Sequence, residues 1–209
     1  MKRKITCFCD NSFEVEAKEE INLDEDPASL DSILDGSFMN FTCPRCNKKH
    51  KPEFRLSLLW PSRKIRFDVF PELDRGEFYR QKKIQSDKSP YPLEIIIGYP
   101  EMAERLAVIR DGYEPAAIEA IKYYLFVKAE EQYPDDELEI WYFGEQGTML
   151  EFHIHGIREN EVAVMKIPDS IYEKTLDDYK RHPKSEIFSA LRVRNYLSVK
   201  NMMRPEELK

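Results

Sequence analysis

The residues best suited to chemistry in this chain are four cysteines arranged as two close pairs. One pair is Cys7 and Cys9, the other is Cys43 and Cys46, and the 209 residues hold no further cysteine. Two thiol pairs of this kind are typical of a tetrahedral metal site with four cysteine ligands, above all of zinc. We therefore predict that these four residues bind one structural Zn²⁺ ion.

Each pair must bend the backbone to bring its two sulfurs to one ion. Residues two apart on an extended strand lie about 6–7 Å apart, whereas sulfurs bound to one zinc lie roughly 3.8 Å apart at bond lengths of about 2.3 Å. We expect Asp10 and Asn11 to form the bend after Cys9, because asparagine tolerates the left-handed conformation. Asn47 follows the second pair at a position where glycine is common in metal-binding knuckles.

Three interpretations of the cysteines compete. The leading one is a closed zinc site that joins two hairpins and stabilises the fold, with no open position for a catalytic water. Another is an iron site, since iron fits the same tetrahedral sulfur set, or thiols that bind no metal, both of which we expect less. A redox Cys-x-x-Cys motif needs a helix N-terminus to lower the thiol pKa, and the residues at 47–52 indicate a turn and a strand instead.

The first part of the chain predicts a β-rich unit around these pairs. Short strands are expected at 5–7 and 13–15, a helix at 27–34 before Gly36, and two longer strands at 53–60 and 64–70. The expected helix lies between the two cysteine pairs. We therefore predict a zinc-ribbon-like domain over residues 1–90 with a helical insertion.

The rest of the chain has a different pattern and predicts a second domain, residues 91–209. An apolar strand at 93–98 precedes helices at 101–110 and 115–132, and three strands follow. These ranges are 138–143, 149–155 and 162–167, with two final helices expected at 169–180 and 185–203. The predicted fold class is α+β, with an antiparallel sheet in the second unit.

Charge is unevenly distributed along a chain whose net charge is −7. An acidic stretch at 10–35 precedes a basic block at 45–66. The net charge argues against binding nucleic acid with the whole surface. The basic block nevertheless offers a set of phosphate-binding side chains: Arg45, Lys48, Lys49, Lys51, Arg55, Arg63, Lys64 and Arg66.

Targeting and membrane segments are not expected. Acidic residues interrupt the region where a signal peptide would be apolar, and the longest apolar runs are too short to cross a bilayer. We predict a cytoplasmic protein, since thiols in that compartment stay reduced and available for metal.

The cysteine pattern resembles a known family. A short hairpin with Cys7 and Cys9, an acidic helix-bearing insertion, and then Phe-Thr-Cys-Pro-Arg-Cys at 41–46 are similar to the CpXC-domain proteins of prokaryotes. The resemblance continues loosely through the helical segment at 101–131. It implies metal binding by Cys7, Cys9, Cys43 and Cys46, and it implies no reaction.

Other candidate residues carry weaker signals. His153 and His155 would share one face of a strand with Glu151, where we expect ordinary hydrogen-bonded histidines rather than metal ligands. His50 follows Cys46 closely but is not expected to be a ligand. No phosphate-binding glycine loop, His-Glu-x-x-His or Gly-x-Ser-x-Gly motif is present.

The leading functional hypothesis is a non-enzymatic, metal-stabilised module that binds another protein. The first alternative is nucleic-acid binding through the basic block, with Trp60 and Phe67 stacking on bases. The second is an enzyme in the C-terminal unit whose site no linear motif reveals, and a concave pocket lined by His153, His155 and Glu151 would favour it. The sequence does not specify the oligomeric state.

Overall fold

A computed structural model describes residues 1–81, 90–134, 136–159 and 161–203, and it divides into two compact units. The units are 1–103 and 104–209. The division falls later than the expected boundary near residue 90 because the strand at 93–97 pairs with a strand of the first unit. Residues 82–89, which belong to a polar stretch at 74–92, lie outside the described residues.

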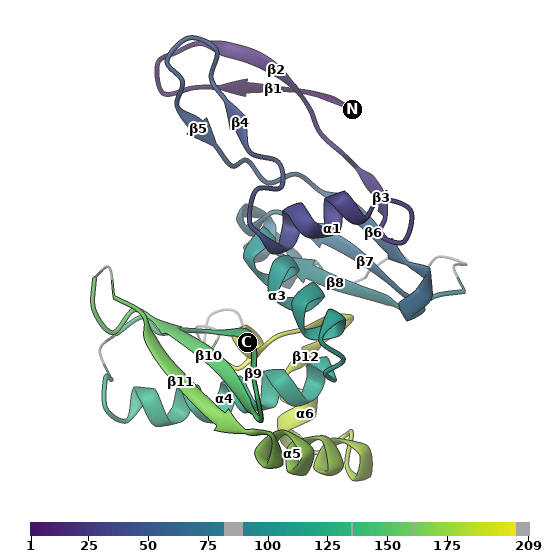
Figure 1. Ribbon diagram of the computed structural model, residues 1–209, viewed down its shortest axis with the longest axis vertical. Helices are drawn as coiled ribbons and strands as arrows, with labels where there is room; N and C mark the ends of the chain where they lie inside the picture. Colours follow the sequence, from purple (N-terminus) through teal and green to yellow (C-terminus); the bar gives the residue numbers. More distant parts are fainter. Residues whose placement is uncertain (82–89, 135, 160, 204–209) are drawn as a thin grey trace. The chain divides into compact units, whose positions relative to one another are not determined.

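The first unit begins with two small antiparallel hairpins, seen at the top of Figure 1. β1 (Lys2–Thr6) pairs with β2 (Ser12–Glu16), and β4 (Phe41–Thr42) pairs with β5 (Lys49–His50). Each hairpin carries one cysteine pair in its turn. The helix predicted between them is confirmed as α1 (Pro27–Leu34), which Asp26 caps by accepting a hydrogen bond from the Ser29 backbone.

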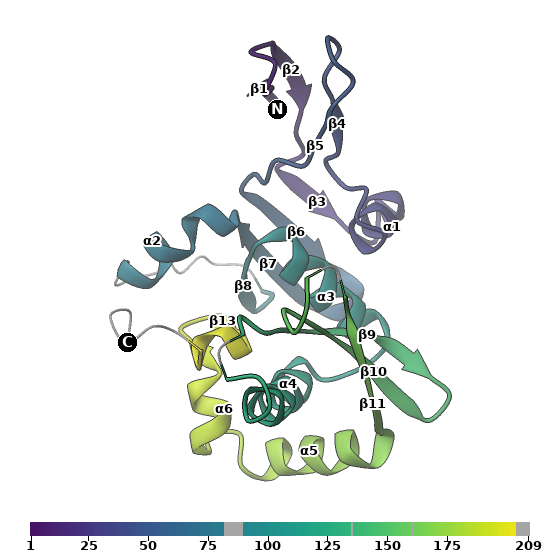
Figure 2. The ribbon, with the colours of Figure 1, turned by 90° about the vertical axis from the view of Figure 1, so that its left-hand side faces the viewer.

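The rest of the first unit is a mixed sheet. Its order is β8 (Leu93–Ile97), β7 (Ile65–Phe70), β6 (Leu56–Trp60) and β3 (Glu20–Asn22). The β6–β7 pair is antiparallel, and the two outer pairs are parallel. The views in Figures 1 and 2 place α1 and the start of α3 (Tyr99–Arg110) on one side of this sheet.

The turns of the first unit supply several short elements. The 3₁₀ turn η1 (Pro61–Arg63) joins β6 to β7, while η2 (Glu72–Asp74) leads into α2 (Arg75–Arg80). The side chain of Phe78 on α2 is buried and its ring lies 6.3 Å from that of Phe70. β8 then enters α3 through Gly98, whose φ is +88° and where a Cβ would lie 2.8 Å from Glu72 Oε2.

The second unit contains the antiparallel sheet that the sequence predicts. β10 (Met149–His155) lies between β9 (Glu139–Gln146) and β11 (Ala163–Pro168). Helix α4 (Pro115–Glu130) packs on this sheet, and its core includes Ile118, Ile121, Leu150 and Phe152. α5 (Asp169–Arg181) packs beside α4.

The predicted C-terminal helix at 185–203 is wrong over most of its length. Only α6 (Glu186–Ala190) is helical, and the chain continues as a hairpin of β12 (Arg192–Val193) and β13 (Tyr196–Leu197) before η3 (Val199–Asn201). The helix stops at Ala190, and Arg194, with φ +57°, lies in the tight turn that joins β12 to β13. The apolar spacing that predicted a helix instead buries Tyr196 and Leu197 in a tight hairpin.

A buried ion network lies in the second unit, and no motif in the sequence revealed it. Lys122 Nζ lies 2.6 Å from Glu104 Oε2 and 3.4 Å from Glu119 Oε1. Glu104 also accepts a hydrogen bond from the Tyr142 backbone, and Glu119 accepts one from the Val199 backbone. Burial raises the pKa of Glu104, while the Lys122 ammonium acts to lower it.

Arg105 also pairs with Glu119, at 3.2 Å, so the network has two cations and two carboxylates. Lys122→Met leaves the buried Glu104 carboxylate without its cation, while Glu119 keeps Arg105, and it should destabilise the second unit by about 3–5 kcal/mol. Lys128→Met, on the exposed side of the same helix, should change stability by less than about 0.5 kcal/mol. Hydrogen exchange of the α4 amides in increasing urea measures both, and equal effects of the two variants would refute a structural role for the network.

Candidate metal centre

The two cysteine pairs meet at one point, although they come from hairpins far apart in sequence. The Sγ atoms of Cys7 and Cys46 are 3.5 Å apart, and those of Cys9 and Cys43 are 3.8 Å apart. All four sulfurs lie within 4.8 Å of one another. Sulfurs bound to one tetrahedral ion should lie roughly 3.8 Å apart, so this group could hold a metal ion.

Each cysteine pair lies in a turn closed by backbone hydrogen bonds. In the first turn the Asp10 N–H donates to the Cys7 carbonyl, and in the second the Asn47 N–H donates to the Cys43 carbonyl. Asn47 takes the left-handed conformation, with φ +58°. In the first turn that conformation belongs to Asp10, with φ +62°, rather than to Asn11 as the sequence had suggested.

Asn11 has a different role from the one expected. Its side-chain Nδ2 lies 3.7 Å from Cys43 Sγ, in the opposite hairpin. Arg45 makes a reciprocal contact, because its Nη1 donates to the Cys9 carbonyl at 3.2 Å. One side chain of each turn therefore contacts a cysteine of the other turn. These two contacts help to orient the metal-binding groups.

The thiols differ in acidity before an ion binds. Burial acts to raise the pKa of Cys43, but the backbone N–H groups of Cys46 and Arg45 outweigh it and lower that pKa from 9.0 to about 6. The Cys9 backbone acts to lower the pKa of Cys7, but burial and the neighbouring sulfurs raise it to about 12. A divalent cation would replace the protons that keep such closely spaced sulfurs neutral.

The centre differs in exposure from one side to the other. Cys7 and Cys43 are buried, Cys9 is half-buried and Cys46 is exposed. All four residues offer thiols rather than disulfides. With four protein ligands available for a tetrahedral ion, the donor set suits structural support of the hairpins better than metal catalysis.

His50 lies near the centre without joining the group of four. Its ring stacks on Phe8, with centroids 5.9 Å apart and planes at 19°, and it meets Phe13 edge-on at 6.1 Å. The side chain of Phe8 is 81% exposed, at the position between Cys7 and Cys9. Lys48 Nζ lies 4.3 Å from the centre of the Phe8 ring.

The other histidines lie in the second unit. His153 Nε2 lies 2.9 Å from Glu151 Oε1, and the His153 ring stacks on Phe143 at 3.9 Å. Hydrogen bonding to His153 lowers the pKa of Glu151, and Lys166 lies 3.3 Å from the same carboxylate. His155 is exposed at the end of β10.

A polar cavity of about 380 Å³ adjoins these residues, and Glu151, Asp111 and Glu145 are among those that line it. A pocket lined by His153, His155 and Glu151 together would have favoured the enzyme alternative. Of these three residues, only Glu151 lines this cavity.

The basic block does not form the stacking surface predicted for it. Trp60 and Phe67 are 5% and 0% exposed, because their side chains lie on the buried face of the sheet. Arg55 is ion-paired with Asp74 at 2.8 Å. Arg45, Lys48 and Lys49 lie on the second hairpin, whereas Arg63 and Lys64 lie at the turn between β6 and β7.

The fold and the site define an α+β protein whose N-terminal unit holds four cysteines at the tips of two β-hairpins. The chain belongs to the CpXC family, because the family model described as "CpXC protein" matches residues 5–122. It is similar to an "Uncharacterized protein" of Treponema pallidum (strain Nichols), with 27% identity over 221 residues. That alignment covers 95% of this chain and 97% of the relative, whereas no solved structure matches significantly.

The geometry predicts one metal ion per chain and a graded loss of binding. Titration with Co²⁺ should give the visible absorption of a tetrahedral thiolate site and saturate at one equivalent. Cys43→Ser should weaken binding by more than about 100-fold, and Asn11→Ala by about 10–100-fold because it removes a hydrogen bond to a ligand sulfur. Ser12→Ala, in the same hairpin, should keep full affinity. An unchanged spectrum and stoichiometry in Cys43→Ser would refute the ligand set.

Proposed function

We propose that this protein is a zinc-stabilised, non-enzymatic module of the cytoplasm that binds another protein. The observation that carries the proposal is the meeting of four sulfurs from two hairpins, at separations that suit a closed tetrahedral site. Zinc is favoured over iron because it is the usual ion of structural sites with four cysteine ligands. Among the described residues, no helix is long and apolar enough to cross a membrane.

The metal would stabilise hairpins that bury little surface themselves. An isolated two-stranded hairpin is marginal in water, and β4 and β5 contain only two residues each. Structural zinc in small peptides binds with about 10–16 kcal/mol at neutral pH. That free energy is large enough to determine whether both turns are ordered. The side chains on their outer surface are held in place only when the turns are ordered.

The surface that the ion would organise carries an aromatic anchor. We define the knuckle surface as Phe8, between the first two cysteines, together with the two residues that contact it, Lys48 and His50. The Phe8 ring contacts the His50 ring and the Lys48 ammonium, yet 81% of the residue remains exposed. Aromatic side chains, phenylalanine included, are enriched in the buried core of protein–protein interfaces.

The proposal predicts that partner binding depends on Phe8. In quantitative crosslinking from cells that produce the full chain, Phe8→Ser should lose at least about 90% of the specific partner, in line with a hot-spot cost of about 2 kcal/mol or more. Leu73→Ser is the matched control, because Leu73 is 97% exposed in η2, away from the cysteines. A partner set that is unchanged in Phe8→Ser, with metal still bound, would contradict the proposal.

A second candidate, nucleic-acid binding, is supported by the cation above the Phe8 ring. Trp60 and Phe67 are buried, whereas Phe8 is exposed and could stack on a base. Lys48 lies over its ring, and Arg45 and Lys49 occupy other exposed positions of the second hairpin. Stacking beside basic side chains is the usual mode of single-strand binding.

This candidate predicts binding to a single-stranded oligonucleotide that weakens steeply as salt rises. Lys48→Glu with Lys49→Glu should lower the affinity by more than tenfold in fluorescence anisotropy. Lys64→Glu, at the β6–β7 turn, should lower it much less. Binding that is absent at low salt, or equal in the two charge-reversal variants, would exclude this candidate.

A further inference from the structure

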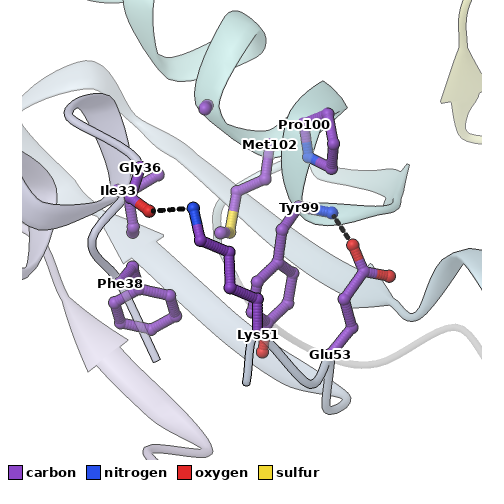
Figure 3. A pocket seen from close by; sticks show the side chains of 9 residues that line it. Ile33, Gly36, Phe38, Lys51, Glu53, Tyr99, Pro100 and Met102 are labelled. Atoms are coloured by element: carbon purple, nitrogen blue, oxygen red, sulfur yellow. Dashed lines mark hydrogen bonds between the residues drawn. The ribbon is translucent and has the colours of Figure 1, made fainter. Parts of the chain in front are cut away.

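A second feature of the first unit, distinct from the cysteine centre, is an apolar cavity of about 250 Å³. Its walls come from three segments: the end of α1 with the loop after it, the stretch that follows β5, and the first turns of α3. Figure 3 shows Ile33, Phe38, Tyr99 and Met102 around it, with Lys51 and Glu53 among the lining side chains. None of the four cysteines lines it.

The cavity walls are almost entirely hydrocarbon. Ile33 and Met102 belong to the buried core, and the ring of Phe38 lies 5.7 Å from that of Tyr99. The Tyr99 hydroxyl is already committed, because it donates to the Phe54 carbonyl at 3.1 Å and accepts from the Phe54 N–H at 3.0 Å. Tyr99 therefore offers a ligand its ring face rather than a polar atom.

The two charged side chains of the cavity differ in how many hydrogen-bonding positions remain for a ligand. Glu53 is satisfied at both oxygens, since Oε1 accepts from the Tyr99 N–H at 2.7 Å and Oε2 from the Glu72 N–H at 2.6 Å. It thereby neutralises the N-terminus of α3 from within the protein. An anion in the cavity would gain nothing from that helix end.

Lys51, unlike Glu53, keeps hydrogen-bond donors for a ligand. Its ammonium donates to the Gly36 carbonyl at 3.2 Å, which holds the side chain across the cavity (Figure 3). Within the described part of the chain it forms no ion pair, although Glu53 lines the same cavity. An ammonium has three donors, so two are left that no anionic group of the described residues takes up. Lys51 is an exposed residue, so a ligand can reach these donors.

We propose that this cavity binds a small monocarboxylic acid with an apolar body. The carboxylate takes the remaining donors of Lys51, and the body lies among Phe38, Tyr99 and Met102. The volume fits this class, since an engineered cavity of about 150 Å³ holds benzene and 250 Å³ leaves room for a short chain with a carboxylate. An amine would meet the like charge of Lys51, so the site discriminates by charge.

This inference goes beyond the proposed function. It assigns the first unit a small-molecule ligand and uses none of the residues of the knuckle surface. Failure of either proposal therefore leaves the other standing.

Calorimetric titration of the metal-loaded full chain with 3-phenylpropionate tests the site. Wild-type protein should bind one equivalent, and the uncharged analogue 3-phenylpropanamide should bind about tenfold more weakly, since hydrogen bonds to charged groups contribute most to such contacts. Lys51→Met should lower affinity for the acid about tenfold and leave that for the amide unchanged. Lys49→Met, an exposed lysine of β5, should match wild type for both ligands.

A filling variant separates the cavity from a surface charge effect. Ala103→Phe places a ring where the ligand body would lie, so it should abolish binding of both acid and amide. Absence of saturable binding of the acid to wild type would overturn the proposal. So would equal affinity for acid and amide in wild type, a comparison that does not depend on whether any variant folds.

Discussion

The N-terminal hairpins depend on one constraint, the convergence of four sulfurs from two turns that are distant in the sequence. Cys7 and Cys9 lie in one turn and Cys43 and Cys46 in another, yet their sulfurs approach to 3.5 and 3.8 Å. Uncharged thiols provide little attraction at that spacing, and ionised ones would repel each other. A divalent cation removes the repulsion between the ionised sulfurs, because all four thiolates then bind the same positive ion.

The two units are stabilised by different means. The second unit has a conventional core between α4 and its sheet. It also buries an ion network in which Lys122 and Arg105 balance Glu104 and Glu119. The hairpins of the first unit bury little beyond the sulfurs themselves. A metal therefore matters locally, and the exposed ring of Phe8 owes its fixed position to the turn that the cysteines close.

The sequence predicted the local elements better than their connections in space. Spacing alone indicated the cysteine turns, α1 and the three strands of the second unit, since each follows a simple period or turn signal. It failed at 185–203, where the helix stops at Ala190 and the chain turns back on itself at Arg194 to form a hairpin. It also assigned Trp60 and Phe67 to a surface, although the alternation of Ile65, Phe67 and Val69 already indicated a buried face. The ion network and the cavity join segments distant in sequence, which no linear pattern reveals.

The central claim is that a metal ion at the four cysteines orders the hairpins and leaves the second unit unaffected. Hydrogen exchange of the full chain, before and after removal of bound zinc with a chelator, tests it most directly. We expect loss of protection in β1, β2, β4 and β5, with α4 and the strands β9 to β11 unchanged, and full recovery when zinc returns. Equal protection of the hairpins with and without the ion would contradict the claim.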